Sequence, residues 1–112
     1  MVEIRQITDD YSVAPQIQPG DVAAIKAAGF RTIISNRPDA EEGAVPHGTV
    51  EAAARAAGLE FRYIPVISGQ ITMENVEDQA AALDSLPGPV LAYCRSGARC
   101  TNLFGMVQQK RG

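Results

Sequence analysis

One short segment of the chain, Tyr93-Cys94-Arg95-Ser96-Gly97-Ala98-Arg99, combines a nucleophile with groups that bind anions. Cys94 follows the apolar run Val90 to Tyr93, which is typical of a strand buried in a parallel sheet. Gly97 lets the backbone curl so that several N–H groups point to one place, and Arg99 adds positive charge. This environment favours an oxyanion and lowers the pKa of a thiol below its ordinary value of about 8.5. The segment therefore predicts covalent chemistry at Cys94 on a sulfur or phosphorus oxyanion.

The other residues of the loop have supporting roles in this hypothesis. We expect Cys94 and Arg99 to be catalytic and the substrate anion to be bound by the loop residues Arg95, Ser96, Gly97 and Ala98. Arg37 could bind the same anion, although an arginine at the end of a strand often only solvates a loop. Cys94 could also be merely a small apolar residue at a strand end, but packing alone does not require Cys, Gly and Arg in one turn.

Strands and helices that alternate along the chain must position this loop. Short β-branched or alternating runs predict strands, and apolar residues at helical spacing predict helices. The predicted strands are residues 2–7, 12–14, 31–36, 59–66 and 90–93, and the predicted helices are residues 19–28, 49–57, 72–86 and a last one from about residue 99. This order indicates an α/β fold with three α/β/α layers and a central, mostly parallel sheet. Ligands of such sheets bind beyond the carboxyl ends of the strands, where Cys94 lies. The polar loop at residues 36–46 is long enough to be a second functional loop.

Length and composition limit the class of protein. A chain of 112 residues fits one domain, residues 1–112, and 46% apolar residues are ordinary for a globular protein. A net charge of −3 provides no overall attraction for nucleic acid or an anionic membrane, so neither is an expected partner. The charged start has no signal-peptide pattern, and we expect a cytoplasmic location. In a reducing compartment, Cys94 and Cys100 are neighbours more typical of reactivity than of a structural disulfide.

The sequence lacks the residue patterns that are typical of metal sites, nucleotide-binding loops and serine hydrolases. His47 is the single histidine and has no neighbouring ligands at metal-binding spacing, so we expect a surface histidine, no metal and no cofactor. The chain contains no nucleotide-binding Gly-Lys-Ser/Thr loop and no plausible Ser-His-Asp set. Kinase and serine hydrolase functions are therefore excluded.

Four stretches together resemble a known family: Ser12 to Ile17, Thr32 to Asp39, Ile64 to Thr72 and Ala92 to Arg99. The last resembles the loops of rhodaneses and protein tyrosine phosphatases. Nearly the whole chain is similar to the phosphatase-like domain of β-lactamase-hydrolase-like proteins, also called a sulfurtransferase family. The resemblance implies a protein-tyrosine-phosphatase-like fold and an association of the related domain with sulfide detoxification beside a persulfide dioxygenase. No residue supports β-lactam chemistry.

The length of the Cys94 loop and the position of a possible acid distinguish a phosphatase from a sulfurtransferase. Tyrosine phosphatases have five residues between the cysteine and the arginine, whereas four separate Cys94 from Arg99, and Cys100 stands where the phosphatase arginine would be. The shorter loop resembles that of rhodaneses. Small phosphatases often place an acidic residue in an Ile-Pro-x-x-Asp pattern, but Ser68 stands at that position here. Asp39 could replace this acid or could be an ordinary loop residue.

These details favour a sulfurtransferase that forms a persulfide on Cys94 and passes the sulfur to a small thiol or to cyanide. A persulfide dioxygenase would be a partner. The alternatives are a phosphatase that forms a cysteinyl phosphate, with Asp39 as acid, and a non-catalytic module that senses anions or oxidants. Cys100 stands where the resemblance leads us to expect serine. It could attack oxidised Cys94 as a resolving thiol, or it could be a buried small residue.

Overall fold

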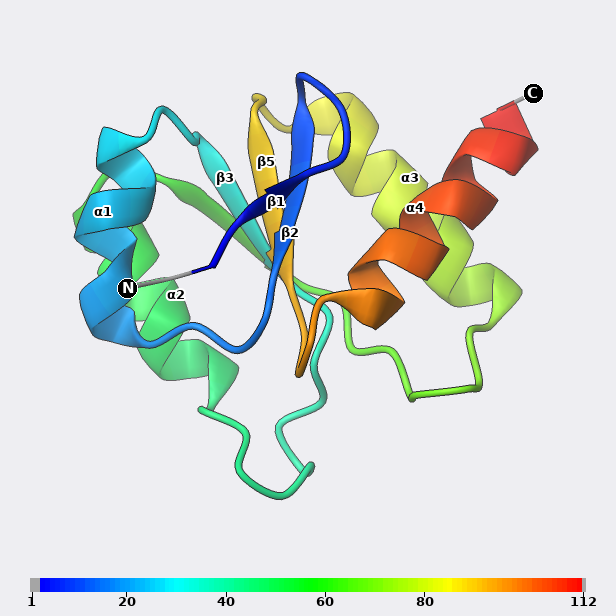
Figure 1. Ribbon diagram of the computed structural model, residues 1–112, viewed down its shortest axis with the longest axis horizontal. Helices are drawn as coiled ribbons and strands as arrows, with labels where there is room; N and C mark the ends of the chain where they lie inside the picture. Colours follow the sequence, from blue (N-terminus) through cyan, green and yellow to red (C-terminus); the bar gives the residue numbers. More distant parts are fainter. Residues whose placement is uncertain (1–2, 112) are drawn as a thin grey trace.

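Strand β5 is the central strand of a five-stranded sheet in the computed structural model, which describes residues 3–111 (Figure 1). The strand order is β1-β2-β5-β3-β4, and only the pairing of β1 with β2 is antiparallel. The strands are β1 (Arg5–Gln6), β2 (Tyr11–Ala14), β3 (Thr32–Ser35), β4 (Glu60–Tyr63) and β5 (Val90–Tyr93). The prediction of a mostly parallel sheet is confirmed.

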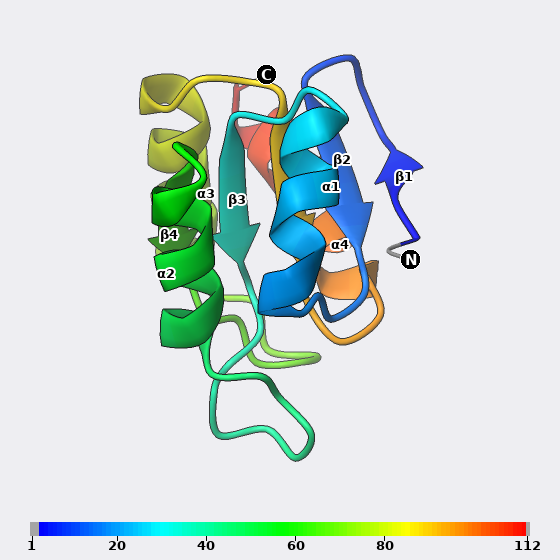
Figure 2. The ribbon, with the colours of Figure 1, turned by 90° about the vertical axis from the view of Figure 1, so that its left-hand side faces the viewer.

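Helices cover both faces of the sheet. A 3-10 turn and helices α1 and α2 lie on one face, and α3 and α4 lie on the other (Figures 1 and 2). Their bounds are η1 (Pro19–Asp21), α1 (Val22–Ala27), α2 (His47–Ala56), α3 (Met73–Ser85) and α4 (Ala98–Arg111). The predicted three-layer α/β/α architecture is therefore confirmed. The strand expected at residues 2–7 is shorter than predicted, and residue 2 lies outside the described residues.

Alternate residues of the strands build two separate cores because successive side chains point to opposite faces of a sheet. Ile33 and Leu91 pack beneath α1 and α2, while their neighbours Ile34 and Ala92 pack against the face that α3 and α4 cover. All four are fully buried. The continuous apolar runs in these strands follow from this burial on both sides. In residues 3–111, no helix is long and apolar enough to cross a membrane.

The parallel strands end at a common edge. Ser35 is in register with Tyr93 and with Tyr63, and Ala14 is also in register with Tyr93. The segments that follow these four strands therefore leave the sheet side by side. The segment after the central strand begins with Cys94, which places the predicted nucleophile between the segments that follow β2 and β3.

A buried amide pair holds the first residue after β3. The Asn36 side chain donates to the Ile64 carbonyl at 2.9 Å and to Gln79 Oε1 of α3 at 3.0 Å, and both amide residues are fully buried. Asn36→Ala leaves the Gln79 amide without this partner, and we expect it to lower the free energy of unfolding by about 1–3 kcal/mol. Urea denaturation measures the change. The matched control Asn102→Ala, on the exposed side of α4, should change it by no more than about 0.5 kcal/mol. Equal effects of the two substitutions would contradict a stabilising role for the amide pair.

Candidate active site

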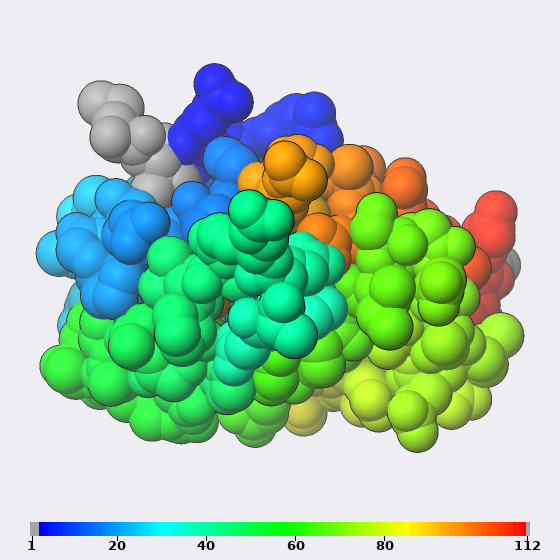
Figure 3. Space-filling model, turned by 90° about the horizontal axis from the view of Figure 1, so that it is seen from below, coloured from blue at the N-terminus to red at the C-terminus, as the bar shows by residue number. Residues whose placement is uncertain are grey.

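Three loops meet at the carboxyl edge of the sheet. They are residues 36–46 after β3, residues 64–72 after β4 and residues 94–97 after β5. Figure 3 views the molecule from this side and shows the three loops next to one another, coloured teal, lime green and orange. Residues from all three line one pocket of about 510 Å³, which we call the edge pocket. Its lining residues are Arg37, Glu41, Glu42, Ser68, Arg95, Ser96, Ala98 and Arg99.

Cys94 directly precedes the loop residues Arg95 and Ser96 that line this pocket, and backbone donors surround its sulfur. The Gly97 N–H donates to Cys94 Sγ at 3.0 Å, and the N–H groups of Ser96 and Cys100 also stabilise the sulfur. Gly97 has a φ of 93°, which residues with a side chain rarely adopt, so glycine is required for this turn. Cys94 has no exposed surface in this conformation. The predicted curl of the loop around the thiol is therefore present.

These donors change the ionisation of both thiols. The hydrogen bond from the Cys100 side chain is the largest influence, and with the backbone N–H groups it outweighs burial and lowers the pKa of Cys94 to about 5. Burial raises the pKa of the Cys100 thiol well above its ordinary value, and the neighbouring Cys94 thiolate adds to this. Cys94 is thus a thiolate at neutral pH, while Cys100 keeps its proton and donates it in a hydrogen bond.

This arrangement predicts the effect of Cys100 on the titration of Cys94. Cys100→Ala removes the side-chain donor, so the pKa of Cys94 should rise, whereas Cys100→Ser restores a donor and should keep it low. The ultraviolet absorbance of the thiolate, followed from pH 4 to pH 9, measures the midpoint. An unchanged midpoint in Cys100→Ala would show that the backbone N–H groups alone are enough to lower the pKa of Cys94.

The lowered pKa also gives stability a defined pH dependence. A thiol that loses its proton more readily in the folded chain stabilises that chain fully above the unfolded pKa of about 8.5. This contribution is lost as the pH falls through the folded value of about 5.

Arg99 reaches the edge pocket from the first turn of α4. Its Nη1 donates to Glu41 Oε2 at 2.6 Å and to the Val66 carbonyl at 2.8 Å, and its Nη2 donates to Glu41 Oε1 at 2.9 Å. The arginine is 8% exposed. Four intervening residues, one fewer than in tyrosine phosphatases, therefore still allow the guanidinium to enter the pocket beside the Cys94 loop.

Arg37 is tied to its own loop. Its guanidinium donates to Gln16 Oε1 at 2.9 Å, to the Glu42 carbonyl at 2.8 Å and to Glu41 Oε1 at 3.1 Å. With only 6% of its surface exposed, the side chain lines the pocket but has its donors engaged by protein groups. The structure supports Arg37 mainly as the residue that shapes the loop and orients Glu41, and its predicted contact with substrate stays a prediction.

Asp39 lies away from the edge pocket, paired with the single histidine. Its Oδ2 is 2.7 Å from His47 Nδ1, and its Oδ1 accepts from the His47 N–H at 2.9 Å at the start of α2. The His47 ring stacks on Tyr63. Burial of Asp39 opposes its ionisation, but the hydrogen bonds from His47 outweigh burial and lower the pKa of the carboxyl. Asp39 is not among the residues that line the edge pocket, and its catalytic role stays a prediction.

Three pocket residues were not expected from the sequence: Glu41, Glu42 and Ser68. The only signal for them was that they lie on the two loops that follow β3 and β4. Of the residues expected to bind the anion, Arg95, Ser96 and Ala98 line the pocket, while Gly97 contributes its N–H to Cys94. Cys100 lies next to Cys94 in one buried cluster, and its role as a resolving thiol stays a prediction.

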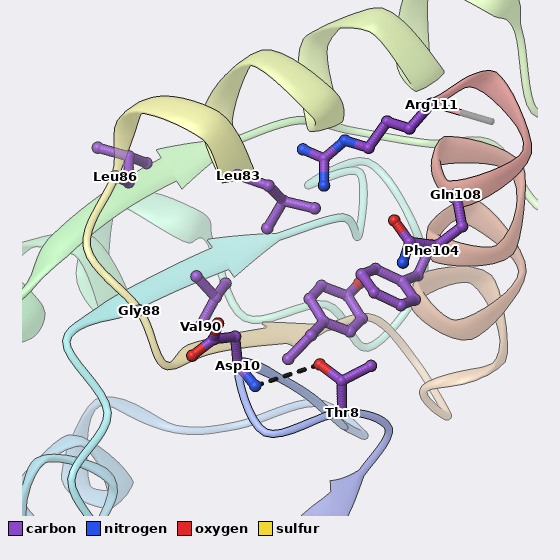
Figure 4. Close-up of a pocket in the computed structure, with 10 residues that line it drawn as sticks. Thr8, Asp10, Leu83, Leu86, Gly88, Val90, Phe104, Gln108 and Arg111 are labelled. Atoms are coloured by element: carbon purple, nitrogen blue, oxygen red, sulfur yellow. Dashed lines mark hydrogen bonds between the residues drawn. The ribbon is translucent and has the colours of Figure 1, made fainter.

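A second cavity of about 440 Å³ lies at the opposite edge of the sheet, near the amino ends of β2 and β5 (Figure 4). Phe104 and Arg111 from α4 and Leu83 from α3 face the turn before β2, where the Asp10 N–H donates to Thr8 Oγ1 at 3.1 Å. Neither cysteine lines this cavity or the edge pocket, but Arg95 and Ser96, which directly follow Cys94, line the edge pocket, so the edge pocket is the candidate reactive site. Within residues 3–111, no three His, Cys, Asp or Glu side chains gather in a way that could hold a metal ion.

The sequence of this chain is similar to those of a known family and of two of its curated relatives. Residues 3–111 match the family described as the phosphatase-like domain of beta-lactamase hydrolase-like protein. The chain is 35% identical over 100 residues to the beta-lactamase hydrolase-like protein of Agrobacterium fabrum, covering 88% of this chain and 23% of that protein. It is 33% identical over 108 residues to the protein of that name from Xylella fastidiosa, covering 96% of this chain and 25% of that protein. The chain therefore spans about a quarter of the length of these curated relatives.

Solved structures share the fold. A candidate phosphatase from Neisseria meningitidis superposes with a TM-score of 0.86 at 32% identity, covering 97% of this chain and 78% of that one. The core catalytic domain of a PP-IP phosphatase from S. cerevisiae superposes with a TM-score of 0.73 at 13% identity, covering 95% of this chain and 64% of that one. This second likeness shows the fold alone. The match over residues 3–111 and the shared fold place this chain in the family of phosphatase-like domains of beta-lactamase hydrolase-like proteins.

Proposed function

We propose that this domain is a cysteine-dependent phosphatase that releases inorganic phosphate through a cysteinyl-phosphate intermediate. The observation that carries the proposal is the Cys94 thiolate, which backbone N–H groups stabilise and whose loop lines the same pocket as Arg99. Cys94 would attack phosphorus, while the N–H groups and Arg99 would hold the phosphoryl oxygens. The family and the resemblance to a candidate phosphatase support the same activity.

This proposal reverses the order of the two activities expected from the sequence. The short loop favoured sulfur transfer, but the family match and a similar solved structure support a phosphatase-like protein. Sulfur transfer stays the second candidate because thiolate attack on a sulfane sulfur needs no proton donor, and Asp39 is held by His47 outside the edge pocket. The persulfide dioxygenase partner, the thiol acceptor and the cytoplasmic location stay predictions.

The test compares both reactions on one preparation of the wild-type protein. Phosphate release from p-nitrophenyl phosphate is measured beside thiocyanate formation from thiosulfate and cyanide. Intact-mass analysis of rapidly quenched protein then identifies the group attached to Cys94. A phosphoryl adduct with phosphate release supports the proposal, whereas a single added sulfur with thiocyanate formation would establish the sulfurtransferase instead.

A further inference from the structure

Glu41 presents a carboxylate to the catalytic arginine. Both of its oxygens accept hydrogen bonds from Arg99, at 2.6 and 2.9 Å, and one also accepts from Arg37 at 3.1 Å. Among the described residues, no other carboxylate is bonded to Arg99, and 27% of the Glu41 side chain is exposed. The carboxylate therefore occupies the guanidinium face to which a substrate oxyanion would bind.

The in-line geometry of phosphoryl transfer determines which residues lie near the leaving oxygen. In phosphoryl transfer the attacking and leaving atoms lie roughly in line with phosphorus. Cys94 is fully buried and the loop residues that follow it line the edge pocket, so a substrate attacked by Cys94 would direct its leaving oxygen toward that pocket. Among residues 3–111, the acidic residues that line that pocket are Glu41 and Glu42, both from the loop after β3.

A leaving oxygen with a high pKa needs a proton as its bond to phosphorus breaks. The guanidinium groups of the pocket hold their protons too tightly, and the hydroxyls of Ser68 and Ser96 are too weakly acidic. Asp39 is engaged by His47. Of the described residues that line the pocket, the two glutamates remain, and Glu41 is the one bonded to Arg99.

We propose that Glu41 is the general acid of the phosphoryl transfer. The proposal rests on the phosphatase function proposed above and adds a catalytic residue that the sequence did not indicate. Arg37, which fixes the loop and donates to Glu41, would be its positioning residue.

Glu41 acquires its proton when a bound phosphate replaces it as the hydrogen-bond partner of Arg99. In the free protein, the hydrogen bonds from Arg99, followed by those from Arg37, lower the pKa of Glu41 and keep it ionised. A bound phosphate dianion replaces the carboxylate on Arg99 and brings negative charge close to Glu41, and both changes raise its pKa. Glu42 adds negative charge to the same pocket, Arg95 adds positive charge, and Arg37 remains bonded. Substrate binding is thus coupled to proton uptake from solvent.

The proposed reaction has two chemical steps, which form and then hydrolyse the cysteinyl phosphate. In the first, the Cys94 thiolate forms an S–P bond, the P–O bond to the leaving group breaks, and the leaving oxygen takes the proton from Glu41. In the second, water attacks phosphorus and gives a proton to the Glu41 carboxylate. The S–P bond breaks, the thiolate is regenerated and inorganic phosphate leaves. Glu41 returns its proton to solvent when it pairs with Arg99 again.

The experiment varies the leaving group. Steady-state rates are measured with p-nitrophenyl phosphate, whose phenol is acidic and needs little protonation, and with phenyl phosphate, whose phenol has a pKa of about 10. We expect Glu41→Gln to lower kcat with phenyl phosphate by about 10²- to 10⁴-fold and to have a much smaller effect with p-nitrophenyl phosphate. The matched control is Glu51→Gln, which removes the carboxylate of another Arg–Glu pair, with Arg55 on the surface of α2.

Other results of these measurements would contradict the proposed role of Glu41. An equal loss with both substrates would overturn the proposal, because Glu41 would then only orient Arg99. A gain in activity would also overturn it, because the carboxylate would only compete with substrate. The leaving-group effect in Glu42→Gln instead of Glu41→Gln would assign the proton to the neighbouring residue. Absence of Cys94-dependent phosphate release from the wild type would refute the phosphatase function itself, and this inference with it.

A second measurement needs no substitution. The pH dependence of kcat reports ionisations in the enzyme–substrate complex. For the wild type, kcat with phenyl phosphate should fall at alkaline pH as Glu41 loses its proton, while kcat with p-nitrophenyl phosphate should not. Parallel profiles for the two substrates would contradict the proposal even if Glu41→Gln failed to fold.

Discussion

Cys94→Ser should lower kcat/KM for p-nitrophenyl phosphate by about a thousandfold or more, because it removes the covalent route. The surroundings of Cys94 lower its pKa to about 5, so the thiol is ionised at neutral pH. A serine hydroxyl in the same place stays protonated and has no histidine to activate it, because the one histidine is bonded to Asp39. Phosphate release by the purified variant measures the loss.

Two controls separate loss of chemistry from loss of structure. Cys100→Ser changes the other thiol but leaves the nucleophile and a side-chain donor in place, so phosphatase activity should persist. Cys94→Ser should still bind inorganic phosphate, since Arg99 and the loop N–H groups remain, and calorimetry measures this binding. Undiminished turnover by Cys94→Ser would contradict covalent catalysis at this residue.

Arg99→Lys should lower kcat/KM by about 10²- to 10³-fold. The guanidinium makes two parallel hydrogen bonds to Glu41 and one to the Val66 carbonyl. A lysine keeps the charge but cannot present two parallel donors to an oxyanion, so the transition state loses stabilisation that charge alone does not restore. Steady-state kinetics with p-nitrophenyl phosphate measures the change.

The matched control is Arg55→Lys, which alters an Arg–Glu pair on the surface of α2 that is not part of the edge-pocket lining. Its activity should stay within about twofold of the wild type, because exposed ion pairs contribute little to stability. If Arg99→Lys also retained nearly full activity, the oxyanion would have to be held by the backbone N–H groups alone. Arg99 would then be a structural partner of Glu41.

Local patterns were sufficient for the order and the approximate positions of the helices and strands, although β1 and β4 are shorter than predicted. Gly29 and Gly58, both with positive φ, follow α1 and α2 where the sequence placed their ends, and Thr72 caps α3 through Asn75. The run Val90 to Tyr93 is the buried central strand, as its continuous apolar character predicted. The last helix continues through Gly105 despite its low propensity, because Phe104 and Val107 on either side of it are buried.

The roles of the loop residues were harder to predict, because loops obey no periodicity. Asp39 and Glu41 are two residues apart in one polar loop, and both carry a carboxyl group. Their difference arises from distant partners: His47 binds Asp39, whereas Arg99, 58 residues further along the chain, binds Glu41. The sequence thus singled out Asp39 in this loop, whereas Glu41 is the carboxylate of the same loop that is bonded to Arg99. Arg37 was similarly expected near the anion, but Gln16 and the Glu42 carbonyl engage its donors.

The sequence by itself determined the α/β order and the turn that holds Cys94, the candidate nucleophile, because each depends on neighbouring residues. Cys94, Gly97 and Arg99 form one turn between a strand and a helix, and their chemistry needs little else. Only the tertiary structure decided which carboxylate faces that turn. The parallel register brings the ends of β3, β4 and β5 to one edge, and the path of the loop from Asn36 then directs Glu41 toward Arg99 and leaves Asp39 with His47. Such long-range contacts follow from packing, which no local pattern encodes.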